Sequence, residues 1–437
     1  MSALFRQLPG VDTLLQHPDL RQLPPDAVRR ASREVLDGLR REIREGLEEL
    51  PDIPSRVREQ VEALSAMRLK RAINATGIVL HTNLGRAPFA PEAAKAVADV
   101  ARGYSNTEMN LADGKRGGRL DGVREPLRQL TGCEDALAVN NNAGAVMLAL
   151  TALAKGREVV VSRGELVEIG GSFRVPDIMA LSGATLVEVG TTNRTRAEDF
   201  ARAINENTAA LLRVHPSNFR VMGFTERPST RALAALDAPL IEDLGSGALV
   251  SGLGDEPVVG EVLADGADLV CFSGDKLVGG PQAGILAGKK KWVQACRRHP
   301  LYRALRLDKL GLAALEATLR VLLSGEIDRI PALKMLREPG DPVKLLLALG
   351  DAPVTLEDDV GYSGGGALPM QALPGQVVVV RGPDPAALAA ALRAHDPPVI
   401  ARVADDSLRL DPRTLLPGDE VVVAEALHAA LDAAKGG

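Results

Sequence analysis

The 437-residue sequence has few cysteines, no long apolar run and no large excess of charge of either sign. Its three cysteines, Cys133, Cys271 and Cys296, show neither pairing nor metal-ligand spacing. This usage is typical of a reducing cytoplasm and argues against a structural zinc site. The apolar runs are far too short to cross a bilayer, and the N-terminus lacks the pattern of a signal peptide. The net charge of −5 gives no indication of nucleic-acid binding.

The rest of the composition is that of an ordinary globular protein, with 46% hydrophobic and 25% charged residues. A chain of this length exceeds one compact core, and we expect three domains. Residues 1–70 are predicted to be helical, 71–330 a large α/β domain, and 331–437 a small α+β domain. In the first domain, apolar residues recur every three or four positions and predict one amphipathic helix: Val28, Ala31, Val35, Leu39, Ile43 and Leu47.

From about residue 72, short apolar runs alternate with helical stretches. The predicted strands of the large domain are 137–139, 159–161, 185–189, 210–214, 240–241 and 269–272. Strands separated by helices indicate a mostly parallel sheet covered on both faces. A helix over 310–323 then leaves this domain, and the C-terminal pattern predicts strands at 376–381, 399–403 and 407–410 with helices at 385–394 and 420–433.

Lys276 carries the strongest chemical signal, because it follows a predicted strand within Ser273-Gly-Asp-Lys276 and glycines come after it. A lysine just past a strand end can form a Schiff base with an aldehyde cofactor, and partial burial keeps its amine neutral by lowering its pKa. Ser273 suits a hydrogen bond to a phosphate, which the glycines allow the backbone to approach. The alternative is a surface lysine in a glycine-rich turn.

Asp243 ends another predicted strand. Pyridoxal phosphate (PLP) acts as an electron sink only while its pyridine nitrogen is protonated, and an aspartate facing that nitrogen keeps it so. Asp243 precedes Lys276 by 33 residues, room for one helix, so we expect the two at the ends of neighbouring strands. Taken alone, an aspartate at such a position is more commonly a helix cap or a turn residue.

Small residues Asn142, Ala143 and Gly144 lie between a predicted strand and a helix. Exposed backbone N–H groups at a helix start form a natural phosphate site, although an ordinary helix start has the same pattern. A phosphate site, then an acid at a strand end, then a lysine after the next strand is the chain order of PLP enzymes of the aspartate-aminotransferase-like fold (fold type I). His215, which ends another strand, is a candidate neighbour of the ring or a histidine satisfied within its turn.

Two glycine motifs are rejected as nucleotide sites. Gly284–Lys289 resembles a phosphate-binding loop but has one residue too few between its glycines and lacks the following Ser or Thr. Gly245-Ser-Gly247 lacks the third glycine and the downstream acid of a dinucleotide site. We expect both segments to be turns.

Longer motifs resemble one family, the bacterial selenocysteine synthases, or L-seryl-tRNA(Sec) selenium transferases, over nearly the whole chain. The most specific are Ile73-Asn-Ala-Thr-Gly-Ile-Val-Leu-His-Thr-Asn-Leu-Gly-Arg86-Ala-Pro88 and Arg163-Gly-Glu-Leu-Val-Glu-Ile-Gly-Gly-Ser-Phe-Arg174. Others are the segments 8–15, 104–108, 139–142, 215–220 and 273–276.

The resemblance implies a PLP enzyme in which Lys276 carries the cofactor and also removes the Cα proton of the seryl group on tRNA(Sec). Loss of water then gives a dehydroalanyl intermediate, to which selenium from selenophosphate adds to form selenocysteinyl-tRNA(Sec). It further implies that Arg86, Arg303 and Arg306 receive the phosphate of the selenium donor. Guanidinium groups bind phosphate well, and Arg303 and Arg306 are three apart in a predicted helix, although a solvated basic helix face has the same pattern.

The resemblance also implies that the N-terminal domain binds tRNA and that subunits form a ring-shaped homodecamer built from dimers. Residues 1–71 hold 13 Lys/Arg against 12 Asp/Glu, so no basic footprint is visible there. One stretch departs from the family pattern: Gly118 and Leu120 stand where a serine and an aromatic residue are common.

Two other functions compete with this one. The first is a PLP-dependent lyase or transferase acting on a free amino acid or amino sugar, which would not need the N-terminal domain. The second is a non-catalytic scaffold or RNA-binding adaptor, which would make Lys276 and Asp243 incidental.

Overall fold

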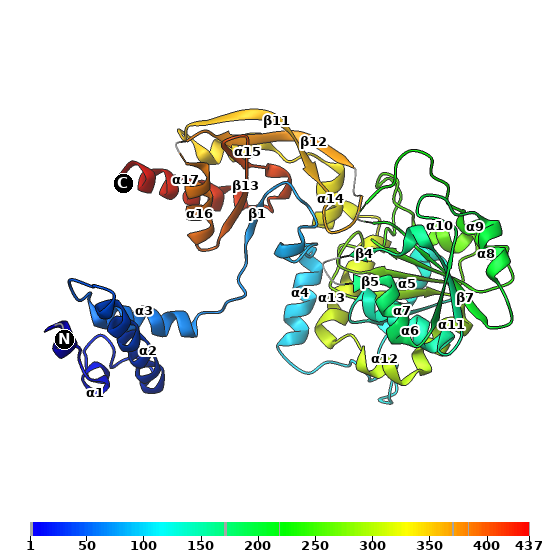
Figure 1. The fold of residues 1–437 in the computed structure, drawn as a ribbon, viewed down its shortest axis with the longest axis horizontal. Helices are drawn as coiled ribbons and strands as arrows, with labels where there is room; N and C mark the ends of the chain where they lie inside the picture. The colour runs from blue at the N-terminus through cyan, green and yellow to red at the C-terminus, as the bar shows by residue number, and fades with distance from the viewer. Residues whose placement is uncertain (1–2, 170–172, 218, 369–370, 383, 437) are drawn as a thin grey trace. The chain divides into compact units, whose positions relative to one another are not determined.

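The computed structural model describes residues 3–169, 173–217, 219–368, 371–382 and 384–436. Two compact units make up the chain, Met1–Arg71 and Ala72–Gly437 (Figure 1). In the described part of the chain, no helix has the length and apolarity needed to cross a membrane.

The N-terminal unit is a small helical domain made of α1 (Val11–Leu15), α2 (Pro25–Arg44) and α3 (Ile53–Ser65). Proline in the first turn of α2 costs no hydrogen bond, because that N–H has no partner within the helix. The predicted apolar stripe of α2 is buried at Val28, Ala31 and Leu39, whereas Val35 is only half-buried. Leu14 of α1 and Val57 of α3 complete this core, which burial of apolar surface stabilises.

A seven-stranded sheet forms the centre of the large unit, in the order β2-β10-β9-β8-β7-β3-β6. The strands are β2 (Asp135–Val139), β10 (Gly284–Gly288), β9 (Leu269–Ser273), β8 (Leu240–Gly245), β7 (Thr208–Val214), β3 (Glu158–Ser162) and β6 (Thr185–Val189). Strands β9, β8, β7, β3 and β6 run parallel, and β10 pairs antiparallel with both β9 and β2. The predicted strands are therefore present.

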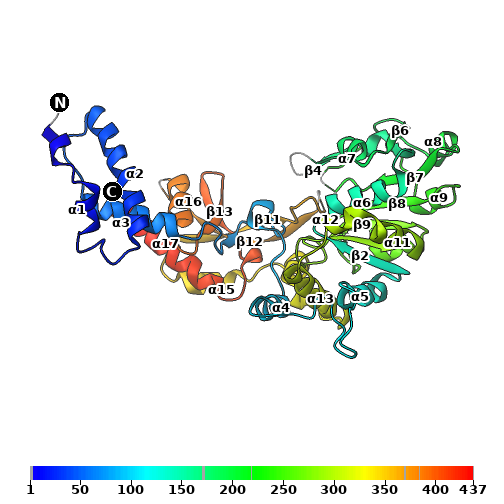
Figure 2. The same ribbon diagram turned by 90° about the horizontal axis from the view of Figure 1, so that it is seen from below.

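Helices cover both faces of this sheet, with α6 and α7 on one side and α5 and α13 on the other (Figure 2). Because both faces are covered, central strands such as β9 are buried at every position, which explains their continuous apolar sequence. The helices are α4 (Pro91–Ala101), α5 (Asp121–Thr131), α6 (Asn142–Ala154), α7 (Val175–Ser182), α8 (Ala197–Ala203), α9 (Thr230–Ala234), α10 (Val259–Ala264), α11 (Lys290–Arg298), α12 (Pro300–Ala304) and α13 (Lys309–Leu323). Strand β4 (Glu168–Ile169) pairs antiparallel with β5 (Phe173–Arg174).

A second sheet, of five strands, has the order β1-β13-β14-β12-β11. Its strands are β1 (Ile73–Ala75), β11 (Val354–Tyr362), β12 (Ala372–Val380), β13 (Val399–Ala404) and β14 (Ser407–Leu410), with helices α14 (Pro331–Arg337), α15 (Pro342–Leu349), α16 (Pro385–Ala394) and α17 (Asp419–Gly436). Strand β1 pairs in parallel with β13. The segment just after residue 71, which we had assigned to the large domain, thus contributes a strand to the C-terminal sheet.

One expectation about a glycine motif was wrong: Gly284–Gly288 is strand β10 and not a turn. Ile285 and Leu286 are fully buried in the sheet. A Cβ on Gly284 would lie 2.0 Å from the carbonyl oxygen of Asn141, so glycine is needed for the close approach of that backbone. Gly245 and Gly247, in contrast, have φ values of 67° and 76° where the chain turns at the end of β8, as expected for a turn.

Candidate active site

Lys276 and Asp243 lie at the same edge of the seven-stranded sheet. Strands β8 and β9 are parallel neighbours, so their carboxyl ends meet there, and Asp243 lies near the end of one while Lys276 follows the other by three residues. Ligands of open α/β sheets bind at this edge. A pocket of about 220 Å³ is present, lined by Arg86, Asn141, Asn142, Ala143, His215, Asp243, Gly245, Ser273, Asp275, Lys276 and Gln282.

The amine of Lys276 is buried, with only 5% of the residue exposed. Burial lowers its pKa below the ordinary lysine value, and the positive charge of Arg86 lowers it further. Asp243 and Asp275 act in the opposite direction without cancelling this shift. A lysine with a lowered pKa holds more of its amine in the neutral form, which is the nucleophile needed to bond with an aldehyde.

The carboxylate of Asp243 is held by two hydrogen bonds to one of its oxygens. Oδ1 accepts from Nδ2 of Asn142 at 2.8 Å and from the backbone N–H of Gly245 at 3.1 Å. Burial raises the pKa of Asp243, while the Asn142 hydrogen bond and the charge of Lys276 oppose the shift. A buried carboxylate whose ionised form is disfavoured gains most from a cationic partner such as a protonated pyridine nitrogen.

The start of helix α6 faces the same pocket. The side chain of Asn141 caps the helix by accepting from the N–H of Gly144 at 2.8 Å. That N–H is therefore occupied, and the N–H groups of Asn142 and Ala143, which have no carbonyl partner within the helix, are the first-turn donors next to the pocket. These two fit the expected phosphate site directly. At Gly144, an added Cβ would lie 2.8 Å from Oδ1 of Asn140, so glycine avoids a clash with that side chain at the helix start.

His215 and Ser273 also line the pocket, as expected. The backbone N–H of His215 donates to the carbonyl oxygen of Asp243 at 2.8 Å, and its Nε2 lies 3.6 Å from Oε2 of Glu256. Glu256 is buried and further accepts from the hydroxyl of Ser246 and the N–H of Leu368. Burial raises the pKa of Glu256, but His215 and these donors outweigh it, and the pKa lies below its usual value.

Of the three arginines expected to bind phosphate, Arg86 lines the Lys276 pocket. Its guanidinium forms an ion pair with Asp275 at 2.6 Å, and its Nε is buried without a hydrogen-bond partner among the described residues. Asp275 and Gln282 line the pocket although sequence reasoning did not single them out. The position of Asp275, next to Lys276 in the chain, was the available signal for it.

Arg303 and Arg306 do not line this pocket. Helix α12 ends at Ala304, so Arg306 lies beyond the helix on which both were expected. Its guanidinium lies 3.5 Å from Glu108 and 5.7 Å from the Tyr302 ring. The N–H of Asn140, just before α6, donates to the carbonyl of Leu305, so this segment runs beside the helix start. Arg303 is exposed.

The local structure explains why Gly118 stands where the family pattern commonly has a serine. Its N–H donates to Oδ2 of Asp121 at 2.9 Å, and a Cβ at this position would lie 2.2 Å from Oδ1 of the same carboxylate. A serine would therefore require the loop before α5 to change. Leu120 is buried, and Arg119 donates to the carbonyl of Leu307 and to Glu108.

The residues of the pocket fit PLP. A buried amine and a buried acid lie at adjacent strand ends, a helix start presents free N–H groups, and Oδ1 of Asn142 is buried without a partner among the described residues. In the described ranges, no group of three or more His, Cys, Asp or Glu side chains could hold a metal ion. Segments 170–172 and 218, which belong to two of the family motifs, lie outside the described residues.

Comparison with known families decides the identity. The family model described as L-seryl-tRNA selenium transferase matches residues 72–416, and a second, described as selenocysteine synthase N terminal, matches residues 5–40. The chain belongs to the L-seryl-tRNA selenium transferase family. The resemblance found in the sequence motifs is thereby confirmed.

Several relatives are similar to this chain over nearly their whole length. The L-seryl-tRNA(Sec) selenium transferase of Solidesulfovibrio magneticus is 49% identical, with 98% of each chain covered. Those of Moorella thermoacetica and Carboxydothermus hydrogenoformans are 47% and 46% identical, covering 99% and 95% of this chain and 98% and 95% of theirs.

A solved structure supports the fold of this family member. D-Glucosaminate-6-phosphate ammonia-lyase aligns with a TM-score of 0.59 and 24% identity, over 86% of this chain and 98% of that one. The expected fold class, an aspartate-aminotransferase-like α/β domain with a small α+β domain and a helical N-terminal domain, is confirmed.

Proposed function

We propose that this chain is an L-seryl-tRNA(Sec) selenium transferase, which replaces the hydroxyl group of the seryl residue on tRNA(Sec) with selenium. The observation that carries the proposal is identity of 46–49% over nearly the whole length of relatives that bear this name. The buried Lys276 site supports the proposal, because a buried amine with a lowered pKa lies in one pocket with a buried acid, Asp243.

PLP, when bound, supplies an electron sink that stabilises the carbanion left after a Cα proton is removed. The chain's own groups then have separate tasks. Nζ of Lys276 would hold the cofactor and, once the amine of the seryl group has displaced it, would be free to accept the Cα proton; its lowered pKa favours the neutral amine that this base needs. Asp243, fixed by Asn142, keeps the pyridine nitrogen protonated. The N–H groups at the start of α6, with Ser273, bind the phosphate of the cofactor.

The selenium donor is proposed to be selenophosphate, received by Arg86, Arg303 and Arg306. Elimination of water from the seryl group and addition of selenium at its β-carbon are separate half-reactions, and a phosphate dianion takes part only in the second. Support for Arg86 is its place in the pocket wall, 2.6 Å from Asp275 beside Lys276. Arg303 and Arg306 are included on the family resemblance.

The N-terminal unit is proposed to bind tRNA(Sec), and the enzyme is proposed to act in the cytoplasm as a homodecamer built from five dimers. Exposed arginines on α2, including Arg29, Arg33 and Arg40, are candidate phosphate contacts. The match of residues 5–40 to the selenocysteine synthase N-terminal family supports a role in this reaction.

A PLP lyase or transferase for a free amino acid or amino sugar is the alternative. It is not favoured, because the ammonia-lyase shares only 24% identity and shows the fold alone.

The test is conversion of purified seryl-tRNA(Sec) by the PLP-loaded protein with selenophosphate. Appearance of selenocysteine on the tRNA supports the proposal, and conversion of free serine in preference to seryl-tRNA(Sec) would instead support the alternative.

A further inference from the structure

A second cavity adjoins the Lys276 pocket at the same edge of the sheet. It has a volume of about 270 Å³, and His215 lines both cavities. Its walls come from the ends of β3, β6 and β7, at Ser162, Thr192 and His215, and from the segments that follow them. Apart from His215, the candidate neighbour of the cofactor ring, no residue of this cavity is assigned to the proposed reaction.

The substrate of the proposed function requires a binding space next to the Lys276 pocket. The seryl group is esterified to the ribose of the last nucleotide of the tRNA, so when its amine reaches Lys276 the terminal adenosine must lie in an adjoining space. A cavity of this volume admits one base with its sugar and excludes a folded RNA arm. We propose that it binds the 3′-terminal adenosine of the aminoacyl-tRNA, an inference that rests on the proposed function.

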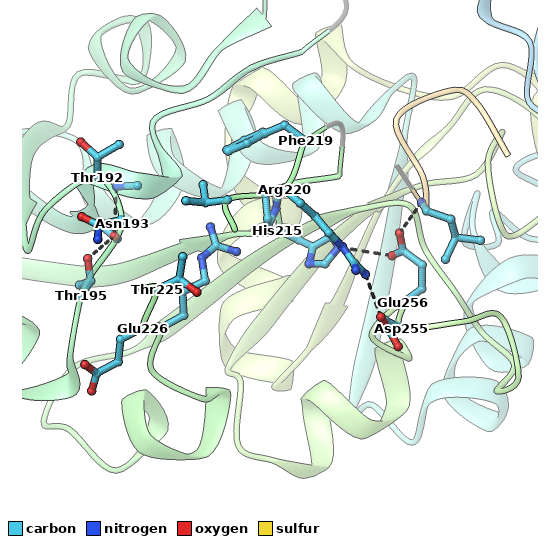
Figure 3. Close-up of a pocket in the computed structure, with 16 residues that line it drawn as sticks. Thr192, Asn193, Thr195, His215, Phe219, Arg220, Thr225, Glu226, Asp255 and Glu256 are labelled. Atoms are coloured by element: carbon cyan, nitrogen blue, oxygen red, sulfur yellow. Dashed lines mark hydrogen bonds and ion pairs between the residues drawn. The ribbon is translucent and has the colours of Figure 1, made fainter. Parts of the chain in front are cut away.

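The side chains of the cavity suit a single unpaired nucleoside. Such bases are recognised by stacking on aromatic rings and by hydrogen bonds to their edges. In the view of Figure 3 the half-buried ring of Phe219 lies above His215, and Asn193 lies at the left with Thr192 and Thr195. Asn193 uses Nδ2 to bind the carbonyl of Phe224. Its Oδ1 can accept from the exocyclic amino group of adenine.

Arg227 supplies a further donor group. Its guanidinium is partly buried, with 37% of the side chain exposed, and its ion-pair contact with Glu165 is long, at 3.9 Å. Glu165 itself accepts from the N–H of Val214. Because a guanidinium carries five N–H donors, this contact leaves donors for a ribose hydroxyl or a ring nitrogen.

The charged side chains of the cavity favour a nucleoside over a phosphate dianion. Three carboxylates, Glu226, Asp255 and Glu256, line it against two arginines, Arg220 and Arg227. Arg220 is paired with Asp255 at 2.8 Å and Arg227 with Glu165 at 3.9 Å. An excess of carboxylates repels a dianion, whereas a neutral nucleoside carries no charge to be repelled.

Another cavity also includes His215, on the side of Arg213 and Glu261, but it has no Phe, Tyr or Trp in its wall. The cavity with Phe219 has a larger aromatic face beside His215, so it is the better match to a base.

The experiment uses the full-length, PLP-loaded protein and tRNA(Sec) whose terminal adenosine is replaced by the fluorescent base 2-aminopurine. Stacking on Phe219 quenches its emission, so the emission in the wild-type complex should be at least about twofold lower than in the complex with Phe219→Leu. Leucine keeps most of the apolar volume and hence the local packing, but it offers no aromatic face. Phe224→Leu is the matched control, because Phe224 is on the same loop, is 86% exposed and does not line the cavity.

A second measurement uses a seryl-ended CCA trinucleotide, which lacks every contact to the N-terminal unit. Loss of one base stack typically weakens binding by about tenfold or more, so Phe219→Leu should raise KM by about that factor while Phe224→Leu leaves it unchanged. Equal emission and equal KM for wild type and both variants, with normal conversion of seryl-tRNA(Sec), would overturn this inference alone. Failure of the wild-type protein to bind or convert seryl-tRNA(Sec) would overturn the proposed function as well.

Discussion

Nδ2 of Asn142 donates a 2.8 Å hydrogen bond to Oδ1 of Asp243. The two residues are 101 positions apart in the chain, and the bond joins the start of α6 to the end of β8. It links the helix start proposed to bind the cofactor's phosphate to the acid proposed to face the cofactor's ring. Both ends of the bound group would therefore be held by elements that position each other.

Replacing Asp243 with asparagine should stabilise the protein without cofactor while impairing the loaded enzyme. Burial raises the pKa of Asp243 in the folded state above its unfolded value. The folded state therefore binds more protons than the unfolded state, and wild-type stability falls as pH rises from the unfolded toward the folded pKa. Urea unfolding of both cofactor-free proteins should show the advantage of Asp243→Asn to be larger at pH 8 than at pH 4.5.

The same variant should lose at least about a hundredfold in turnover, because removing a charged partner from a buried site costs several kcal/mol. Near-normal elimination by Asp243→Asn would leave Asp243 as a structural residue. An advantage that is the same at both pH values would show that its carboxylate is not penalised by burial.

Lys276 should be the single attachment point of the cofactor. The yellow absorbance of the loaded protein should disappear in Lys276→Ala, and borohydride reduction should label the peptide that contains Lys276. Lys289→Ala is a suitable control, since Lys289 is paired with Asp268 at 2.8 Å and does not line the pocket. Label on any other lysine contradicts the assignment.

Arg86, Arg303 and Arg306 should serve the selenium donor and not the loss of water. Each alanine variant is expected to form dehydroalanyl-tRNA at a normal rate and to convert it about tenfold or more slowly, since a guanidinium–phosphate contact is charge-assisted. Single-turnover assays with and without selenophosphate separate the two halves. The exposed Arg298, at the end of α11, provides the control Arg298→Ala.

If a variant slows both half-reactions equally, the assignment of that arginine to the selenium-donor site is wrong. For Arg86 this outcome would point to its ion pair with Asp275 as a support for the Lys276 pocket.

Deletion of residues 1–65 should abolish binding of tRNA(Sec) while leaving a folded core that holds PLP. The basis is that Met1–Arg71 is a compact unit with its own apolar core. With 13 Lys/Arg against 12 Asp/Glu in this unit, recognition must depend on the placement of a few arginines. Filter binding with tRNA(Sec) tests the loss of tRNA binding, and the absorbance of bound PLP tests whether the core stays folded. A truncated protein that binds and processes seryl-tRNA(Sec) normally contradicts this role.

Much of the fold was predictable because its strands are buried on both faces. Continuous apolar runs such as Leu269–Phe272 mark such strands clearly, and β6 and α16 begin and end where the sequence indicated. Strand β11, in contrast, was missed because its positions are exposed or half-buried, except at Gly361, and it carries Glu357, Asp358 and Asp359. Strand β10 was misjudged because its glycines indicated a turn, whereas they serve close backbone contacts.

The site was predictable where chemistry and chain order agree, as at Asp243 and Lys276. Partners far apart in sequence were not predictable, since no local pattern links Asn142 to Asp243 or His215 to Glu256. The prediction that Arg303 and Arg306 share a helix was wrong about where the helix ends. Helix α12 begins at Pro300 and ends at Ala304, before Arg306. Predicted helix ends are uncertain by a few residues, which is enough to separate two side chains three positions apart.

The most direct test of the central claim is a single-turnover reaction of the PLP-loaded protein with radiolabelled seryl-tRNA(Sec) and selenophosphate, followed by hydrolysis and identification of the amino acid. The account predicts that the label moves from serine to selenocysteine with the wild-type protein and stays on serine with Lys276→Ala. Label that stays on serine with a wild-type protein that has bound both PLP and the tRNA, or moves equally with both proteins, would contradict it.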